Sequence, residues 1–120
     1  MDKRLYTEGL DIGLYDAARL DLRHGLLKFG REELVRQLRD PEFLDYEMFS
    51  HARRPARMKR TLLLIRGIAK RLWAFEDKRS MKNYTEETYL VDKDRYDSFT
   101  RGYRDGFQAV CEVRFKKMMS

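Results

Sequence analysis

Basic side chains are concentrated in the middle of the sequence, where eight of them fall within the 19 residues from 53 to 71. Guanidinium and ammonium groups bind phosphate oxygens, and each such contact releases counterions from a nucleic acid. The chemistry predicted for this basic segment is therefore the binding of an anionic partner. The eight residues are Arg53, Arg54, Arg57, Lys59, Arg60, Arg66, Lys70 and Arg71.

The excess positive charge of the chain lies almost entirely in this part of the sequence. The 120 residues carry a formal net charge of +6, from 26 Lys and Arg against 20 Asp and Glu. Residues 51–82 carry 11 basic and 2 acidic side chains, whereas residues 1–50 carry 8 basic and 11 acidic ones. Two interpretations follow. Either the cations project together and contact an anionic partner, or the acidic first part of the chain neutralises them.

Residue types that commonly carry catalysis or bind metals are sparse. The two histidines, His24 and His51, and the single cysteine, Cys111, cannot form a zinc site, because there is no second cysteine and no His-x-His spacing. We expect Cys111 to be a buried apolar residue of the last helix. Asp92 and Asp94 are the residues that an Mg²⁺-dependent enzyme would use, but a role at a helix start is favoured. The sequence favours a non-enzymatic protein with no cofactor and no metal.

The elements that must position the basic segment are all predicted to be helices. Apolar residues recur at steps of three and four, which is the period of an amphipathic helix. We predict an all-α fold, a single helical domain over residues 1–120 with four or five helices. They cover residues 4–29, 31–39, 41–49, 55–75 and a last segment that begins at Asp92 or Asp94 and ends at Lys117. Residues 85–91 are ambiguous between helix and strand.

The helix predicted at 55–75 is the central element, because it combines an apolar seam with a cationic face. The seam consists of Met58, Leu62, Ile65, Ala69 and Leu72, widened by Ile68 and Trp73. The cationic face consists of Lys59, Arg66 and Lys70, with Arg60 and Arg71 beside them. Leu64 and Phe75 flank this face and would offer an apolar or stacking contact.

Two of the predicted helices share a glycine pattern at an offset of 93 residues. Gly9 and Gly13 in the first helix correspond to Gly102 and Gly106 in the last. A glycine inside a helix costs about 1 kcal/mol relative to alanine, so we expect these positions to allow close approach of two helices. The first and last helices are therefore predicted to pack together, as a duplication or as two helices that share a period by chance. The same faces would also allow a homodimer.

The second glycine pair belongs to a short motif. The stretch Arg101-Gly102-Tyr103-Arg104-Asp105-Gly106 resembles the Arg-Gly-Tyr-x-x-Gly motif of the small ribosome-modulation proteins, which bind stalled ribosomes. The resemblance covers six of the 120 residues, and the rest of that family's pattern is absent from this longer chain. It implies RNA or a ribonucleoprotein as the partner.

The basic segment is the most informative feature for function. We expect a non-enzymatic basic helical module that contacts nucleic acid or a nucleoprotein through its cationic helix face. The alternative is a small regulatory protein, an adaptor or inhibitor that docks on an acidic protein surface, since arginine and aromatic residues are enriched at interfaces. A membrane-surface helix has a similar character, but here the apolar seam is needed for the core. With no long apolar run, we expect no membrane span, no signal peptide and a cytoplasmic location.

Overall fold

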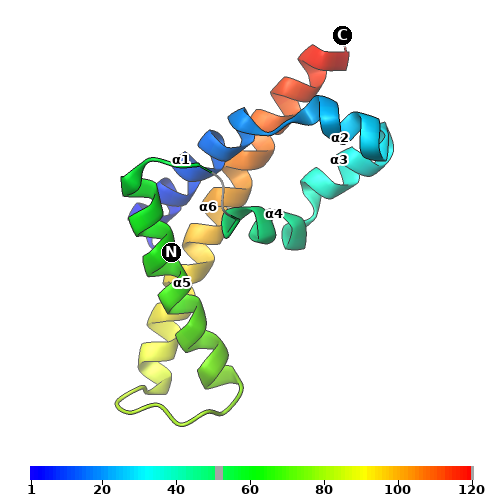
Figure 1. The fold of residues 1–120 in the computed structure, drawn as a ribbon. Coiled ribbons are helices and arrows are strands. Elements are labelled where there is room, and N and C mark those ends of the chain that lie inside the picture. Colours follow the sequence, from blue (N-terminus) through cyan, green and yellow to red (C-terminus); the bar gives the residue numbers. More distant parts are fainter. Residues whose placement is uncertain (51–52, 120) are drawn as a thin grey trace.

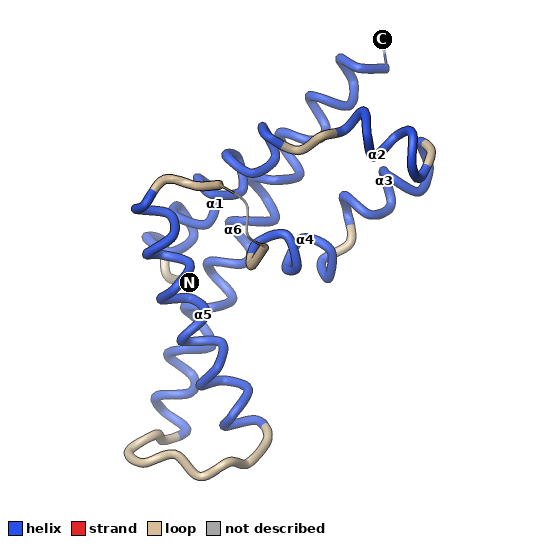
Figure 2. Tube along the Cα trace, viewed as in Figure 1, coloured by secondary structure: helices blue, strands red, loops and turns tan. Residues whose placement is uncertain are grey.

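The computed structural model describes residues 1–50 and 53–119, with Met119 described by its backbone (Figure 1). The prediction of an all-α fold is confirmed, because 83% of the structure is helix and the described residues contain no strand (Figure 2). The described ranges hold six helices rather than four or five. They are α1 (Lys3–Arg19), α2 (Leu22–Phe29), α3 (Arg31–Arg39), α4 (Pro41–Met48), α5 (Ala56–Glu76) and α6 (Glu86–Met119).

Two helices that lie side by side and point in the same direction organise the molecule (Figure 1). α6 is the longest at 34 residues, and α1 packs along it. α5 runs antiparallel to the first part of α6, and the two extend together as an arm (Figure 1). The short helices α2, α3 and α4 lead away from α1 and return to pack on α6. The fold is elongated, with extents of 55 × 26 × 24 Å.

The first predicted helix is divided into α1 and α2, although the sequence pattern predicted one helix from 4 to 29. Leu20 adopts an extended backbone with a ψ of 135°, and the Asp21 carboxylate accepts a hydrogen bond from the amide of His24 at 3.0 Å, which caps α2. Arg114 of α6 donates to the carbonyl oxygens of Ala17 at 2.6 Å and Leu20 at 2.7 Å. A tertiary contact therefore satisfies carbonyl groups that a continuous helix would have bonded internally.

Other boundaries follow local signals that the sequence contains. Gly30 ends α2 with a φ of 80°, a conformation that glycine adopts without steric cost. Asp40 caps α4 by accepting a hydrogen bond from the amide of Glu42 at 3.0 Å, and Pro41 occupies the first helical position. Pro55 directly precedes α5. The breaks on either side of α3 and the start of α5 are therefore where the sequence predicted them.

The last helix begins at Glu86, earlier than the predicted start at residues 92–94. The hydroxyl of Thr85 accepts a hydrogen bond from an amide of the first turn at 3.2 Å. The ring of Tyr89 stacks on Phe75 of α5, with the ring centroids 4.7 Å apart. The segment that was ambiguous between helix and strand is helical, and it packs against the end of α5.

The four glycines lie in the contact between α1 and α6. A methyl group on Gly9 would lie 3.0 Å from the amide nitrogen of Tyr103, and one on Gly102 would lie 3.0 Å from the amide nitrogen of Leu10. Gly9 and Leu10 each precede their counterparts, Gly102 and Tyr103, by the same 93 residues. The contact thus follows the offset of the sequence pattern and is close to two-fold symmetric. These faces are filled within one chain, so they are not free to pair with a second copy.

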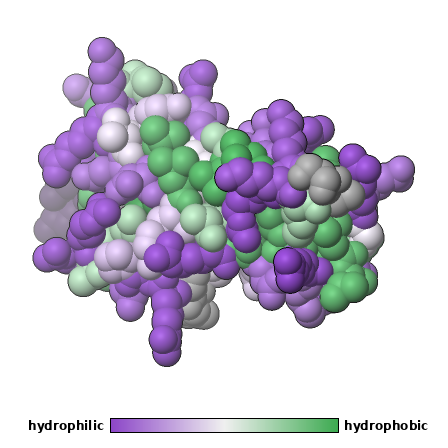
Figure 3. Space-filling model, turned by 90° about the horizontal axis from the view of Figure 1, so that it is seen from above, coloured by the Kyte–Doolittle hydropathy of each residue, from purple (hydrophilic) through white to green (hydrophobic). Residues whose placement is uncertain are grey.

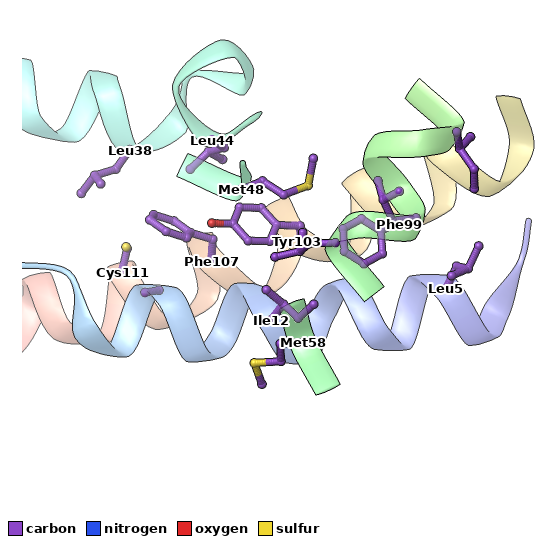
Figure 4. Close-up of a cluster of buried hydrophobic side chains, with 14 of the residues drawn as sticks. Leu5, Ile12, Leu38, Leu44, Met48, Met58, Phe99, Tyr103, Phe107 and Cys111 are labelled. Carbon is purple, nitrogen blue, oxygen red and sulfur yellow. The ribbon is translucent and has the colours of Figure 1, made fainter. Parts of the chain in front are cut away.

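The core lies between α1, α4 and α6 and continues under α5 (Figure 4). Tyr103 and Phe107 of α6 lie at its centre and have no exposed surface. Ile12 of α1 covers them from one side, and Leu44 and Met48 of α4 cover them from another (Figure 4). Because α4 supplies part of this cover, its C-terminal end is held close to α5.

The apolar seam predicted for α5 is buried, from Met58 through Leu72. Trp73, predicted to widen that seam, is instead 53% exposed. Leu14 of α1 is exposed, because Gly9 and Gly13 occupy the contact of α1 with α6. Viewed from above, hydrophilic side chains cover much of the surface, with hydrophobic patches between them (Figure 3).

Candidate nucleic-acid interface

Arg54 belongs to the core, and its prediction as a binding residue is corrected here. Its guanidinium donates to both carboxylate oxygens of Asp16 on α1, at 2.9 Å and 2.6 Å, and to the carbonyl oxygens of Glu47 and Ser50. The Tyr103 hydroxyl donates to the same carboxylate at 2.7 Å. Burial opposes the charge of Arg54, but its bonds with Asp16 outweigh burial and raise its pKa. This network fastens the segment before α5 onto α1 and α6.

Two further cations of the basic segment are paired with carboxylates. Arg57 lies 2.9 Å from Asp11 of α1 in an exposed ion pair. Arg71 donates to Asp92 of α6 at 3.1 Å, and the Tyr84 hydroxyl donates to the same carboxylate at 2.9 Å. Burial would raise the pKa of Asp92, but the hydrogen bonds from Arg71 and Tyr84 outweigh it and lower the pKa. The interpretation that the acidic first part of the chain neutralises the basic segment is thus realised for Arg54 and Arg57, whereas Arg71 pairs with an aspartate of α6.

The other five cations are exposed, and none lies within ion-pair distance of a carboxylate in residues 1–50 and 53–119. They are Arg53, Lys59, Arg60, Arg66 and Lys70. At 100° per residue, Lys59 and Lys70 lie within about 40° of Arg66 around the helix. Arg60, predicted to lie beside this face, is about 120° from Arg66 around the helix and so points away from it.

Three of these cations line a groove between the end of α4 and the first half of α5. The groove has a volume of about 350 Å³. The guanidinium of Arg66 lies 5.6 Å from the centre of the Phe49 ring and donates to the Phe49 carbonyl oxygen at 3.3 Å. We call this hollow the basic groove; it is lined by Met48, Phe49, Ser50, Arg53, Arg54, Lys59, Leu62, Leu63 and Arg66.

A second hollow, of about 580 Å³, adjoins the basic groove and shares Phe49 with it. We call it the aromatic hollow, because it is lined by Tyr46 of α4 and Trp73 of α5, residues that are 73% and 53% exposed. Among the described residues that line either hollow, Asp45 supplies the one carboxylate, and Arg104 binds it at 2.8 Å. The two hollows therefore present free cations beside exposed aromatic rings, with no free carboxylate.

The aromatic residues of this site were not identified from the sequence. Trp73 was assigned to the apolar seam, and Phe75 was named as a residue able to stack. In the structure Phe75 is covered by Tyr89, whereas the ring of Trp73 is exposed. Tyr46 and Phe49 belong to a different helix from the basic segment, and no local pattern shows that α4 ends beside α5. The one sequence signal related to it is the spacing of Leu44 and Met48, two apolar residues four positions apart whose shared face packs into the core.

The other candidate residues for chemistry form no site. Cys111 is buried, and burial raises its pKa to about 11. His24 is exposed on α2, and His51 lies outside the described residues. The carboxylate of Asp94 lies 3.4 Å from the N-terminal amine. In the part of the chain that the structure describes, no three His, Cys, Asp or Glu side chains are grouped as a metal ion would require.

The stretch that resembles ribosome-modulation proteins serves the helix contact. Gly102 and Gly106 face α1, Tyr103 is buried, and Arg104 binds Asp45. These residues have structural roles here, so the resemblance adds nothing to the assignment of a partner.

The chain matches no protein family, no curated protein and no solved structure with which it was compared. Within the described residues, no helix combines the length and the apolar character of a membrane span. Its function is therefore inferred from the geometry of the two hollows.

Proposed function

We propose that this protein is a non-enzymatic nucleic-acid-binding module that holds a phosphate backbone in the basic groove. The observation that carries the proposal is that Arg53, Lys59 and Arg66 line one groove without a carboxylate partner. Arg54, which also lines the groove, and Arg57 are by contrast neutralised by aspartates of α1. Unpaired cations gathered on a concave surface focus a positive potential, which is the electrostatic footprint of a phosphate-binding site.

The spacing of the cations fits a strand that lies along α5. Lys59 and Arg66 are seven residues apart, which is about 10.5 Å along the helix axis. Lys70 follows one turn later, about 6 Å further. Contacts at this spacing engage several phosphates rather than a single small anion. Each phosphate contact releases counterions. If four cations contact phosphates, the logarithm of the binding constant is expected to fall with the logarithm of the salt concentration at a slope of about −3 to −4.

The proposal is tested by fluorescence anisotropy with labelled RNA and labelled duplex DNA at increasing NaCl concentration. Arg66→Glu is expected to weaken binding by about tenfold or more, because a hydrogen-bonded charge contributes about 1.5–3 kcal/mol. Arg60→Glu is the matched control, since it makes the same change of charge on another face of the same helix. We expect it to weaken binding much less than Arg66→Glu does.

Two outcomes overturn the proposal. One is the absence of binding to either nucleic acid at low salt. The other is an equal loss in the Arg66→Glu and Arg60→Glu variants, which would show a response to net charge and no role for the groove. In either case the acidic surface of a protein becomes the better candidate for the partner.

A further inference from the structure

Three cations and two large apolar side chains share the face of α5 that borders the two hollows. In chain order they are Lys59, Leu63, Arg66, Lys70 and Trp73, at steps of four and three residues. These positions fall within about 80° of one another around the helix and span about 21 Å along it. We call this set the α5 row. It runs from the basic groove to the aromatic hollow, which contain Lys59 and Trp73 respectively.

Two aromatic rings of this site are available for stacking. Trp73 and Tyr46 are both more than half exposed, and neither ring pairs with another ring or with a cation among the described residues. Phe49 links the two hollows and lies under the Arg66 guanidinium. Exposed rings beside a positively charged groove are the surface on which proteins bind unpaired bases, because every base has a stacking face.

We infer that the nucleic acid bound here is single-stranded, with its phosphates on Lys59 and Arg66 and with bases stacked on Trp73 and Tyr46. This inference rests on the proposed function. A duplex hides the faces of its bases between their neighbours, so stacking on a protein ring requires unpaired bases.

The position of the α5 row also favours a single strand over a duplex. A helix that reads duplex DNA has to enter the major groove and must therefore project from the protein. The α5 row instead borders hollows whose other wall is the end of α4. The row is about 21 Å long, which is enough to contact several nucleotides of one strand.

The fluorescence of Trp73 tests this inference directly, because it is the one tryptophan of the sequence. The probes are oligothymidylate and oligouridylate of about twelve nucleotides, the duplex of the same oligothymidylate with oligoadenylate, and inorganic polyphosphate. We expect the single strands to quench the emission of Trp73 and to bind at least tenfold more tightly than the duplex. Polyphosphate has no bases, so its binding is expected to leave the emission largely unchanged.

Variants of the ring provide the second arm of the test. Trp73→Ala is expected to lower single-strand affinity by about 5- to 150-fold, which corresponds to the 1–3 kcal/mol of one stacked base. Trp73→Phe keeps a ring and should retain most of the affinity. Leu64→Ala is the matched control, since Leu64 is an exposed apolar residue about 180° from Trp73 around α5. It should bind like the unmodified protein.

The outcomes separate this inference from the proposed function. Duplex binding that equals or exceeds single-strand binding overturns the inference and leaves the proposed function standing. The inference is also overturned, and the proposed function still stands, if single strands bind without changing the emission of Trp73. The same conclusion follows if the Trp73→Ala variant binds single strands with unaltered affinity. Failure of both single strands and the duplex to bind at low salt overturns both. Should Trp73→Ala fail to fold, the quenching and the comparison with duplex still decide.

Discussion

The close approach of α1 and α6 predicts that Gly102→Ala destabilises the protein, although alanine is the better helix former. A methyl group on Gly102 would lie 2.9 Å from the carbonyl carbon of Tyr6 and closer still to its oxygen. Ordinary contacts of such a methyl group begin at 3.4 Å, so the carbon by itself requires a separation of at least 0.5 Å. The obstructing atoms belong to the backbone of α1 and cannot rotate away.

Two opposing terms set the size of the effect. Replacing glycine by alanine inside a helix stabilises the helix by about 1 kcal/mol. Forcing a methyl group into a packed interior costs about 1–3 kcal/mol, and we expect the upper end of that range because two helix backbones must separate. The net loss is therefore about 2 kcal/mol, which lowers the midpoint of urea unfolding by about 1 M for a domain of this size.

Urea unfolding followed by far-UV circular dichroism measures this change, and Gly67→Ala supplies the control. Gly67 lies on α5, where a methyl group would meet nothing closer than the Arg71 guanidinium at 3.9 Å. Gly67→Ala should therefore stabilise the protein, because alanine favours the helix more than glycine does, and it should raise the midpoint of urea unfolding. If Gly102→Ala raises the midpoint as Gly67→Ala does, α1 and α6 are not in backbone contact and the reasoning is wrong.

Three further predictions concern buried and paired charges. Arg54→Met should cost about 3–5 kcal/mol in urea unfolding, because it leaves Asp16 buried without a partner; a loss below 1 kcal/mol would contradict this. Burial and the nearby charge of Asp16 raise the pKa of Glu47, so its ionised form is disfavoured in the folded state. Glu47→Gln should therefore raise the melting temperature at pH 7, with the gain shrinking as the pH falls through the folded pKa; a lower melting temperature at pH 7 would contradict this. The pKa of Asp92 is lowered in the folded protein, because the hydrogen bonds from Arg71 and Tyr84 outweigh the effect of burial. The ionised carboxylate therefore stabilises the fold fully above the ordinary pKa of an aspartate. This stabilisation is lost as the pH falls through the lowered pKa of the folded state. Asp92→Asn should flatten the acid loss of stability, and an unchanged slope would contradict this.

Much of the fold can be predicted from the sequence, because local interactions determine helix class and most helix ends. The steps of three and four residues identify an all-α protein. Gly30 and Pro41 mark ends that backbone sterics require whatever surrounds them. The break after α1 could not be predicted, because Arg114, more than 90 residues away, bonds the carbonyl oxygens there.

The candidate site was only partly predictable from the sequence. Periodicity places Lys59, Arg66 and Lys70 on one face of α5, because the helix angle depends on spacing along the chain. Periodicity could not show that Arg54 forms an ion pair with Asp16, which lies 38 residues away in the chain. Nor could it show that α4 brings Tyr46 beside Trp73.

The sequence by itself therefore determined that this chain is helical, that its charge is concentrated between residues 53 and 71, and that four glycines invite close packing of two helices. Only the tertiary structure decided which cations remain unpaired and which rings stand beside them. The physical reason is that an ion pair or a groove depends on distances between segments far apart in the chain. Those distances are set by how the helices pack, and local sequence patterns do not determine them.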